Sequence, residues 1–118
     1  MKAEFGLKES DVFTICTILE QYPQVSYALI FGSRAKGNYK PGSDVDIALK
    51  GEKLNNQVLN NISFLLNEET NMPYKFDVLN YQSINETALI DHINRVGKLF
   101  YDKQANQGFS SNQTKKNI

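Results

Sequence analysis

The spacing of apolar residues along the chain follows two periods, and each period predicts a different secondary structure. From Ser10 to Tyr22 apolar residues return every three or four positions, as on the buried face of a helix, with Ser10 as N-cap and Asp11 favourable in the first turn. Pro23 marks the end of this helix. Val25–Phe31 is almost continuously apolar, which is typical of a strand covered on both faces.

Helical and strand patterns continue to alternate through the rest of the chain. In Asp44–Lys50 apolar and acidic residues alternate, so one face of a strand can enter a core while the other meets a ligand. The patterns predict a helical turn at Ser33–Lys36 closed by Gly37, a loop at Asn38–Ser43, a helix at Asn55–Glu69, a strand at Tyr74–Asn80, a helix from Ser83 or Asn85 to Val96 and a short edge strand at Lys98–Tyr101. We therefore expect an α/β (α+β) fold, a small mixed sheet backed by helices.

Length and composition narrow this expectation to one domain and a tail. A chain of 118 residues fits a single domain, and 41% hydrophobic and 11% aromatic residues favour a packed core over disorder. Residues 103–118 are rich in Gln, Asn, Ser and Lys, and we expect them to fray. The expected folded domain is therefore residues 1–102.

Charge and cysteine content limit the partners and the compartment. Thirteen basic and thirteen acidic residues cancel, whereas proteins that bind nucleic acid over a large surface carry a basic excess. The single cysteine, Cys16, excludes an internal disulfide and suits a reducing compartment; its apolar helical setting favours packing over reactivity. The first residues lack the apolar run of a signal peptide, and no segment approaches the ~20 apolar residues of a membrane span. We expect a cytoplasmic protein that binds neither membranes nor nucleic acid.

The most informative local pattern joins a Gly-Ser pair to a pair of aspartates. Gly32-Ser33 follows the first predicted strand directly, and ten residues separate Ser33 from Asp44, the first of the pair Asp44 and Asp46 on the next strand. Carboxylates at positions i and i+2 of a strand project from one face and can share a hard cation such as Mg²⁺. A Gly-Ser turn can offer a hydroxyl and free N–H groups to phosphates. Each pair alone is common in turns and strand ends, but together at this spacing they predict a metal–nucleotide site.

With these residues the segment Gly32–Leu49 resembles the signature of the DNA polymerase β-type nucleotidyltransferase superfamily. Within the superfamily it is most similar to the minimal nucleotidyltransferases (MNT), the antitoxins of bacterial HEPN/MNT toxin–antitoxin pairs. The strong match covers 18 residues, and the order of elements extends it over most of the chain. The matching residues are Gly32, Ser33, Ala35, Gly37, Ser43, Asp44, Asp46 and Ile47-Ala48-Leu49.

The resemblance implies an activity and roles for these side chains. It implies Mg²⁺-dependent transfer of AMP from ATP to a tyrosine hydroxyl of a HEPN RNase toxin, with two Mg²⁺ ions held by Asp44, Asp46 and a third aspartate on a later strand. Asp77 is the candidate, since an aspartate in the middle of a strand is disfavoured unless something pairs with it. A solvated edge-strand aspartate is the alternative. The third aspartate would also help to take the proton of the attacking hydroxyl.

Residues beside the Gly-Ser pair are candidates for binding the triphosphate. Gly32 and Ser33 would hold the β- and γ-phosphates, and Arg34 and Lys36 could neutralise them, although solvated loop charges are an equal alternative. The segment has neither P-loop nor Rossmann spacing.

Two other side chains that could carry chemistry are expected to have ordinary structural roles. Tyr39 could stack on a base, but loop aromatics more often only pack. His92, the only histidine, has no partner nearby in the sequence, and we expect a surface or boundary position for it.

Two alternatives to the leading function remain open at this stage. The first is nucleotidyl transfer to a small molecule such as an aminoglycoside, disfavoured because no second, helical acceptor-binding domain is evident in the sequence. The second is an antitoxin that neutralises its toxin by binding alone, which the presence of Asp44, Asp46 and Asp77 disfavours.

Overall fold

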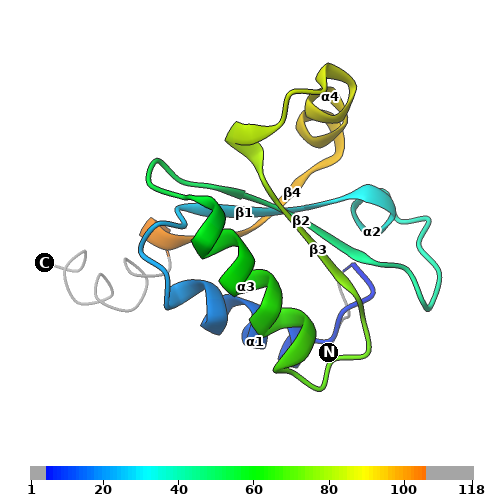
Figure 1. Cartoon of the computed structure of the whole chain (residues 1–118). Helices are drawn as coiled ribbons and strands as arrows, with labels where there is room; N and C mark the ends of the chain where they lie inside the picture. The colour runs from blue at the N-terminus through cyan, green and yellow to red at the C-terminus, as the bar shows by residue number, and fades with distance from the viewer. Residues whose placement is uncertain (1–4, 106–118) are drawn as a thin grey trace, which may run out of the picture.

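A four-stranded mixed sheet forms the centre of the molecule in the computed structural model, which describes residues 5–105 (Figure 1). The strand order is β3-β2-β1-β4; β1 is antiparallel to β2 and β4, and β2 is parallel to β3. The elements are α1 (Glu9–Glu20), β1 (Tyr27–Phe31), α2 (Gly32–Lys36), β2 (Val45–Lys50), α3 (Asn56–Glu68), β3 (Phe76–Asn80), the 3₁₀ turn η1 (Tyr81–Ser83), α4 (Thr87–Val96) and β4 (Lys98–Asp102). The predicted fold class and element order are confirmed.

The start of α1 differs from the sequence prediction. The N-cap is Lys8 rather than Ser10, and the Lys8 N–H donates to Asp11 Oδ2 at 3.1 Å. Asp11 therefore satisfies one of the free N–H groups at the helix start from inside the first turn, the position that suits an acidic side chain. It is almost fully buried and also accepts a hydrogen bond from the Tyr74 hydroxyl at 2.9 Å.

The later helices begin in different ways: a side chain caps α3, whereas none caps α4. The predicted helix at Asn55–Glu69 is α3, and Asn55 caps it by accepting from the Val58 N–H at 2.9 Å. The last helix begins at Thr87, after the predicted Ser83 or Asn85, because residues 81–83 first form the 3₁₀ turn. The Asn80 side chain stabilises that turn by accepting from the Gln82 N–H at 3.1 Å.

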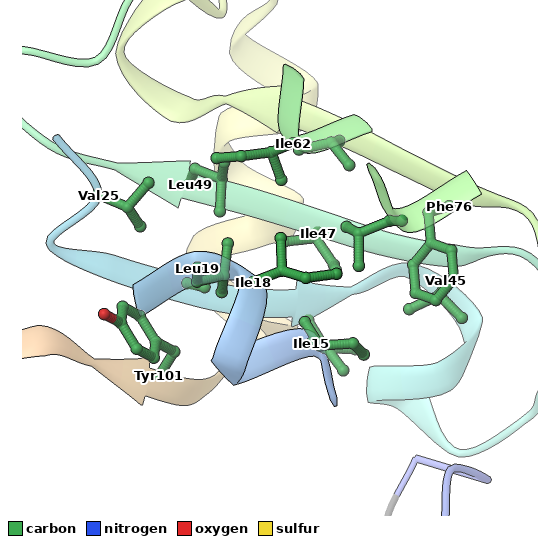
Figure 2. Packing of buried hydrophobic residues seen from close by; sticks show 14 of the residues in the cluster. Ile15, Ile18, Leu19, Val25, Val45, Ile47, Leu49, Ile62, Phe76 and Tyr101 are labelled. Atoms are coloured by element: carbon green, nitrogen blue, oxygen red, sulfur yellow. The ribbon is translucent and has the colours of Figure 1, made fainter. Parts of the chain in front are cut away.

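Helices cover the two faces of the sheet unequally. Helices α1 and α3 lie side by side on one face, and α4 lies on the other (Figure 1). The main core fills the space beneath α1 and α3 (Figure 2), with Val45, Ile47 and Leu49 of β2 all fully buried. On the α4 face the buried cluster consists of Phe31, Ala48 and Ile93. Strand alternation thus sends the apolar side of β2 into the large core and Asp46 to the thinly covered face.

The remaining sequence predictions concern Cys16, the tail and membrane spans. Cys16 is half-buried in α1, and burial raises the pKa of its thiol to about 11, so the unreactive thiol form prevails at neutral pH. Most of the predicted tail, residues 106–118, lies outside the described residues. No helix within residues 5–105 is both long and apolar enough to cross a membrane.

Candidate functional site

The Gly-Ser turn joins the end of β1 to the short helix α2 at one end of the sheet. Gly32 has φ +72°, in the left-handed region that favours glycine, and a Cβ there would collide with the carboxylate of Asp46. Both conditions exclude a larger residue. Gly37, at φ +89°, ends α2 with its N–H donating to Ser33 O at 2.9 Å. The turn therefore brings the chain unusually close to a carboxylate.

Asp46 and Asp77 are neighbours across the parallel strands β2 and β3. They are register partners in that pair. In the neighbouring β1–β2 pair, Asp46 is the register partner of Phe31, the residue before the Gly-Ser turn. Paired strands lie about 4.8 Å apart, so the two aspartates project from the same face at adjacent positions. Asp46 is half-buried and Asp77 is exposed. The structure thus brings the third predicted aspartate beside the second.

Asp44 lies one residue before β2 and is exposed. Its charge is felt by Asp46, whose carboxyl pKa rises to about 6, first through burial and then through the negative charges of Asp77 and Asp44, with Arg34 acting in the opposite direction. The three carboxylates therefore form one electrostatically coupled acidic group. A carboxylate whose pKa is raised by two neighbouring negative charges is one that a divalent cation can compensate.

The acidic group is open rather than closed around a metal position. Within residues 5–105, no three His, Cys, Asp or Glu side chains converge closely enough to form a metal cage. The donor set nevertheless fits Mg²⁺, which binds through one or two carboxylates and keeps places for water and substrate phosphates. Asp44, Asp46 and Asp77 are the residues that could hold it.

Arg34 is buried, contrary to what a loop cation suggests. It is 3% exposed, and each of its three nitrogens donates to a main-chain carbonyl: Nε to Ser43 O and Asp44 O, both at 3.2 Å, Nη2 to Ser43 O at 2.8 Å and Nη1 to Phe5 O at 2.9 Å. The sequence left a phosphate contact and a solvated loop charge equally open for this residue, whereas in the structure its nitrogens donate to the protein main chain. Lys36, at the end of α2, is exposed and remains a candidate for binding phosphate.

Tyr39 packs against this arginine, which accounts for an aromatic residue in the loop. Its ring centroid lies 5.3 Å from Arg34 Cζ, and the Tyr74 ring lies 4.9 Å from the same atom. Both distances are in the range of favourable cation–π contacts. Base stacking by Tyr39, which the sequence left open, would have to use the other face of a ring that is already partly covered.

His92 has a partner that the sequence analysis missed. From α4 it brings Nε2 to 3.2 Å from the Gly32 N–H, which donates to it, and its ring meets Phe31 edge-on at 6.1 Å between centroids. The predicted boundary position is confirmed, because the residue is half-buried, but the prediction of an isolated histidine is wrong. Since Nε2 accepts, the ring proton of the neutral form is assigned to Nδ1. Sixty positions separate the two partners, so no local pattern links them.

The site thus combines an N–H-rich turn with an acidic strand end on the less covered face. One side offers Ser33 and Lys36 for anionic groups, since the Gly32 N–H already donates to His92, and the other offers the three aspartates for cations. A ligand with both properties, an anion accompanied by divalent cations, matches the whole site.

Comparison with known proteins assigns this arrangement to a described family. The family model for "Polymerase beta, Nucleotidyltransferase" matches residues 14–106, which include the Gly-Ser turn and all three aspartates. A search of curated proteins finds no match.

Solved structures with the same fold include chains from toxin–antitoxin complexes. A chain of a toxin–antitoxin crystallised with AMP-PNP is 21% identical with a TM-score of 0.64, over 92% of this chain and 84% of that one. A chain of a tri-AMPylated HEPN toxin–MNT antitoxin complex from Shewanella oneidensis is 19% identical with a TM-score of 0.62, over 86% and 77%. A chain of the MntA–HepT toxin–antitoxin is 19% identical with a TM-score of 0.61, over 91% and 83%. At these identities the likeness establishes a shared fold.

Proposed function

The chain belongs to the polymerase beta nucleotidyltransferase family, and from that premise we propose that it is an antitoxin that transfers AMP from ATP to a tyrosine of a HEPN toxin. One observation carries the proposal: the register pairing of Asp46 with Asp77 beside the Gly32-Ser33 turn. A family member that kept only the scaffold would have no reason to retain this costly acidic group. The toxin–antitoxin complexes that share its fold, one with AMP-PNP and one with an AMPylated toxin, support the choice of nucleotide and acceptor.

Two Mg²⁺ ions would be held by Asp44, Asp46 and Asp77. The bound metal would supply the positive charge that lets an anionic triphosphate approach carboxylates. The pKa of about 6 for Asp46 supports this assignment, since two further negative charges already act on it. At neutral pH the carboxylate is mostly ionised and available as a ligand.

The turn and α2 would hold the transferred nucleotide in line for attack. Ser33 and the N–H groups around it donate to the β- and γ-phosphates, and Lys36 neutralises the pyrophosphate as it departs. The tyrosine oxygen attacks the α-phosphorus; its O–P bond forms as the bond from that phosphorus to the bridging oxygen of pyrophosphate breaks. Asp77, the most exposed strand position of the acidic group, accepts the phenolic proton. Holding these groups in one geometry is the main source of acceleration in such a transfer.

A protein is the acceptor that best fits the charge of this chain. Its basic and acidic residues balance at thirteen each, and binding a nucleic-acid backbone depends on an excess of Lys and Arg. The open end of the sheet, where Asp77 is exposed, leaves room for a macromolecule to present a hydroxyl.

The test is to incubate the protein with Mg²⁺, with ATP labelled at the α-phosphate and with the product of the neighbouring gene, which we expect to be a HEPN protein. Intact mass should show one or more added AMP groups on a toxin tyrosine, and the Asp44→Asn protein should add none. A toxin that stays unmodified yet is inhibited equally without ATP would support the binding-only antitoxin instead. AMP found only on a small molecule would show that the acceptor is a small molecule rather than a protein.

A further inference from the structure

We propose that Arg34 is a positioning residue, which fixes the main chain at Ser43 and Asp44 and thereby sets the Asp44 carboxylate for cation binding. It does not bind phosphate itself. This inference rests on the proposed function, because it assigns a task within the same metal–nucleotide site. It replaces the role that the neighbouring Gly-Ser pair suggests for an arginine at this position.

The hydrogen bonds of Arg34 define the task. Three of its nitrogens donate to the carbonyls of Ser43, Asp44 and Phe5 at 2.8–3.2 Å, and the side chain is 3% exposed. Hydrogen bonds from a charged donor are stronger than those between neutral groups, and releasing them would leave these carbonyls without this partner. Reaching a phosphate would require breaking this set, whereas the exposed Lys36 needs no such change.

The surroundings hold the guanidinium in one orientation. The rings of Tyr39 and Tyr74 lie 5.3 and 4.9 Å from Arg34 Cζ. Tyr74 is itself fixed by donating its hydroxyl to Asp11 at 2.9 Å. A planar fork between aromatic rings is a preorganised donor, so little rotamer freedom remains to be lost when it binds the chain.

The segment before α1 also packs against the Arg34 guanidinium. Gly6 has φ +72°, and a Cβ there would come within 2.7 Å of Arg34 Nη1 and 2.5 Å of Tyr39 Cε1. Phe5, whose carbonyl accepts from Arg34, has the unusual φ of 62°. The first described residues of the chain are thus packed tightly against the arginine that contacts Asp44.

Asp44 needs such support because it stands just outside the sheet. Its neighbour Val45 is anchored by donating its N–H to Lys75 O at 2.9 Å, and Arg34 anchors the two carbonyls on the other side. Between these two anchors the main chain at Asp44 is fixed although its side chain is exposed. Groups that orient a metal ligand in this way typically change metal affinity by about 10–100-fold when removed.

The experiment compares Arg34→Met, Arg34→Lys and the matched control Arg95→Met, which removes an exposed arginine at the end of α4. Mn²⁺ binding in the presence of a non-hydrolysable ATP analogue is measured by electron paramagnetic resonance, and AMP transfer is measured against ATP concentration. We expect both Arg34 variants to weaken Mn²⁺ binding about tenfold or more and to lower kcat, with KM for ATP changed less than threefold. Arg95→Met should match wild type.

Gly6→Ala serves as a second route if the Arg34 variants fold poorly, since it displaces the guanidinium without removing it. Like the Arg34 variants, Gly6→Ala should weaken Mn²⁺ binding. Arg34→Lys with wild-type Mn²⁺ affinity but a tenfold higher KM for ATP would make Arg34 a phosphate ligand and overturn the proposal. A wild-type protein that binds no Mn²⁺ would instead refute the proposed metal-dependent function.

Discussion

The two faces of the sheet differ in the side chains they present, apolar on one face and partly acidic on the other. Beneath α1 and α3 the positions of β2 are Val45, Ile47 and Leu49, all fully buried in a large apolar cluster. On the opposite face, the strand presents Asp46 beside Asp77, with a small cluster under α4. Strand β2 therefore contributes side chains to both the core and the acidic group, and alternation keeps the two apart.

Because different residues form the two faces, we expect folding stability and nucleotidyl transfer to respond to different substitutions in this protein. The core face contributes apolar burial, while the acidic face carries like charges that oppose folding. Substitutions on one face should therefore affect one property and spare, or even improve, the other.

The largest expected effect is on the acidic face. Asp46→Asn removes a proposed cation ligand and should lower AMP transfer by about a thousandfold or more, while the melting temperature stays equal or rises because repulsion from Asp77 and Asp44 is relieved. Transfer is measured by label incorporation and stability by thermal unfolding. Near wild-type transfer by the variant would remove Asp46 from the site.

A core substitution should have the opposite profile. Ile62 on α3 is fully buried (Figure 2), and Ile62→Ala should lower the free energy of unfolding by about 2–5 kcal/mol through lost burial and a cavity. Transfer per folded molecule should stay within a factor of about two. Leu99→Ala, at a position 54% exposed, is the matched control and should change stability little. Equal loss of specific activity in Ile62→Ala would show that the two faces are not independent.

A smaller effect is expected at the turn. Ser33→Ala should raise KM for ATP about tenfold, corresponding to the loss of one hydrogen bond to a charged phosphate. Thr17→Ala removes an exposed hydroxyl that donates to Phe13 O within α1 and should leave KM unchanged. Binding of labelled ATP by both variants checks the result, and an unaltered affinity in Ser33→Ala would exclude the hydroxyl from phosphate binding.

The smallest effect concerns pH in the metal-free protein. The folded-state pKa of Asp46, about 6, lies above the ordinary 3.8, so the folded state holds this proton more tightly than the unfolded state. Stability should therefore fall as pH rises from about 4 to about 6 and level off above, by about 1 kcal/mol once solvent screening of this half-exposed group is allowed for. Denaturant unfolding at several pH values should show the slope in wild type. The same slope in Asp46→Asn would assign it to another group.

Much of the fold was predictable because periodicity reports which side chains are buried. The alternation in residues 44–50 predicted both the core face and the acidic face of β2, and the spacing of apolar residues placed α3 to within a residue at each end. The prediction of Ser10 as N-cap was wrong because Asp11, from within the first turn, bonds the Lys8 N–H. The late start of α4 was missed because the Asn80 side chain favours a 3₁₀ turn first.

The site was less predictable where it depends on contacts between distant segments. Gly32 and Asp46 could be paired from spacing, since a short loop and strand join them, but His92 reaches Gly32 from sixty positions away. Burial of Arg34 also depends on Tyr74 and Phe5, which belong to other elements. A charged residue in a Gly-Ser segment looks like a ligand contact until the packing around it is known.

The position of β1 between β2 and β4 bears on how the chain folds. β1 pairs first with β2, some twenty residues on, but its other edge is closed only by β4, with Tyr27 opposite Asp102. Closing that long loop is slow relative to forming local contacts. During synthesis the apolar β1 therefore presents an unpaired edge until the last described strand emerges, and in that interval the nascent chain is most exposed to association with other chains. All the residues proposed for the metal–nucleotide site precede β4 in the chain and are synthesised before it. The sheet that carries the three aspartates is therefore completed only after those aspartates have been made.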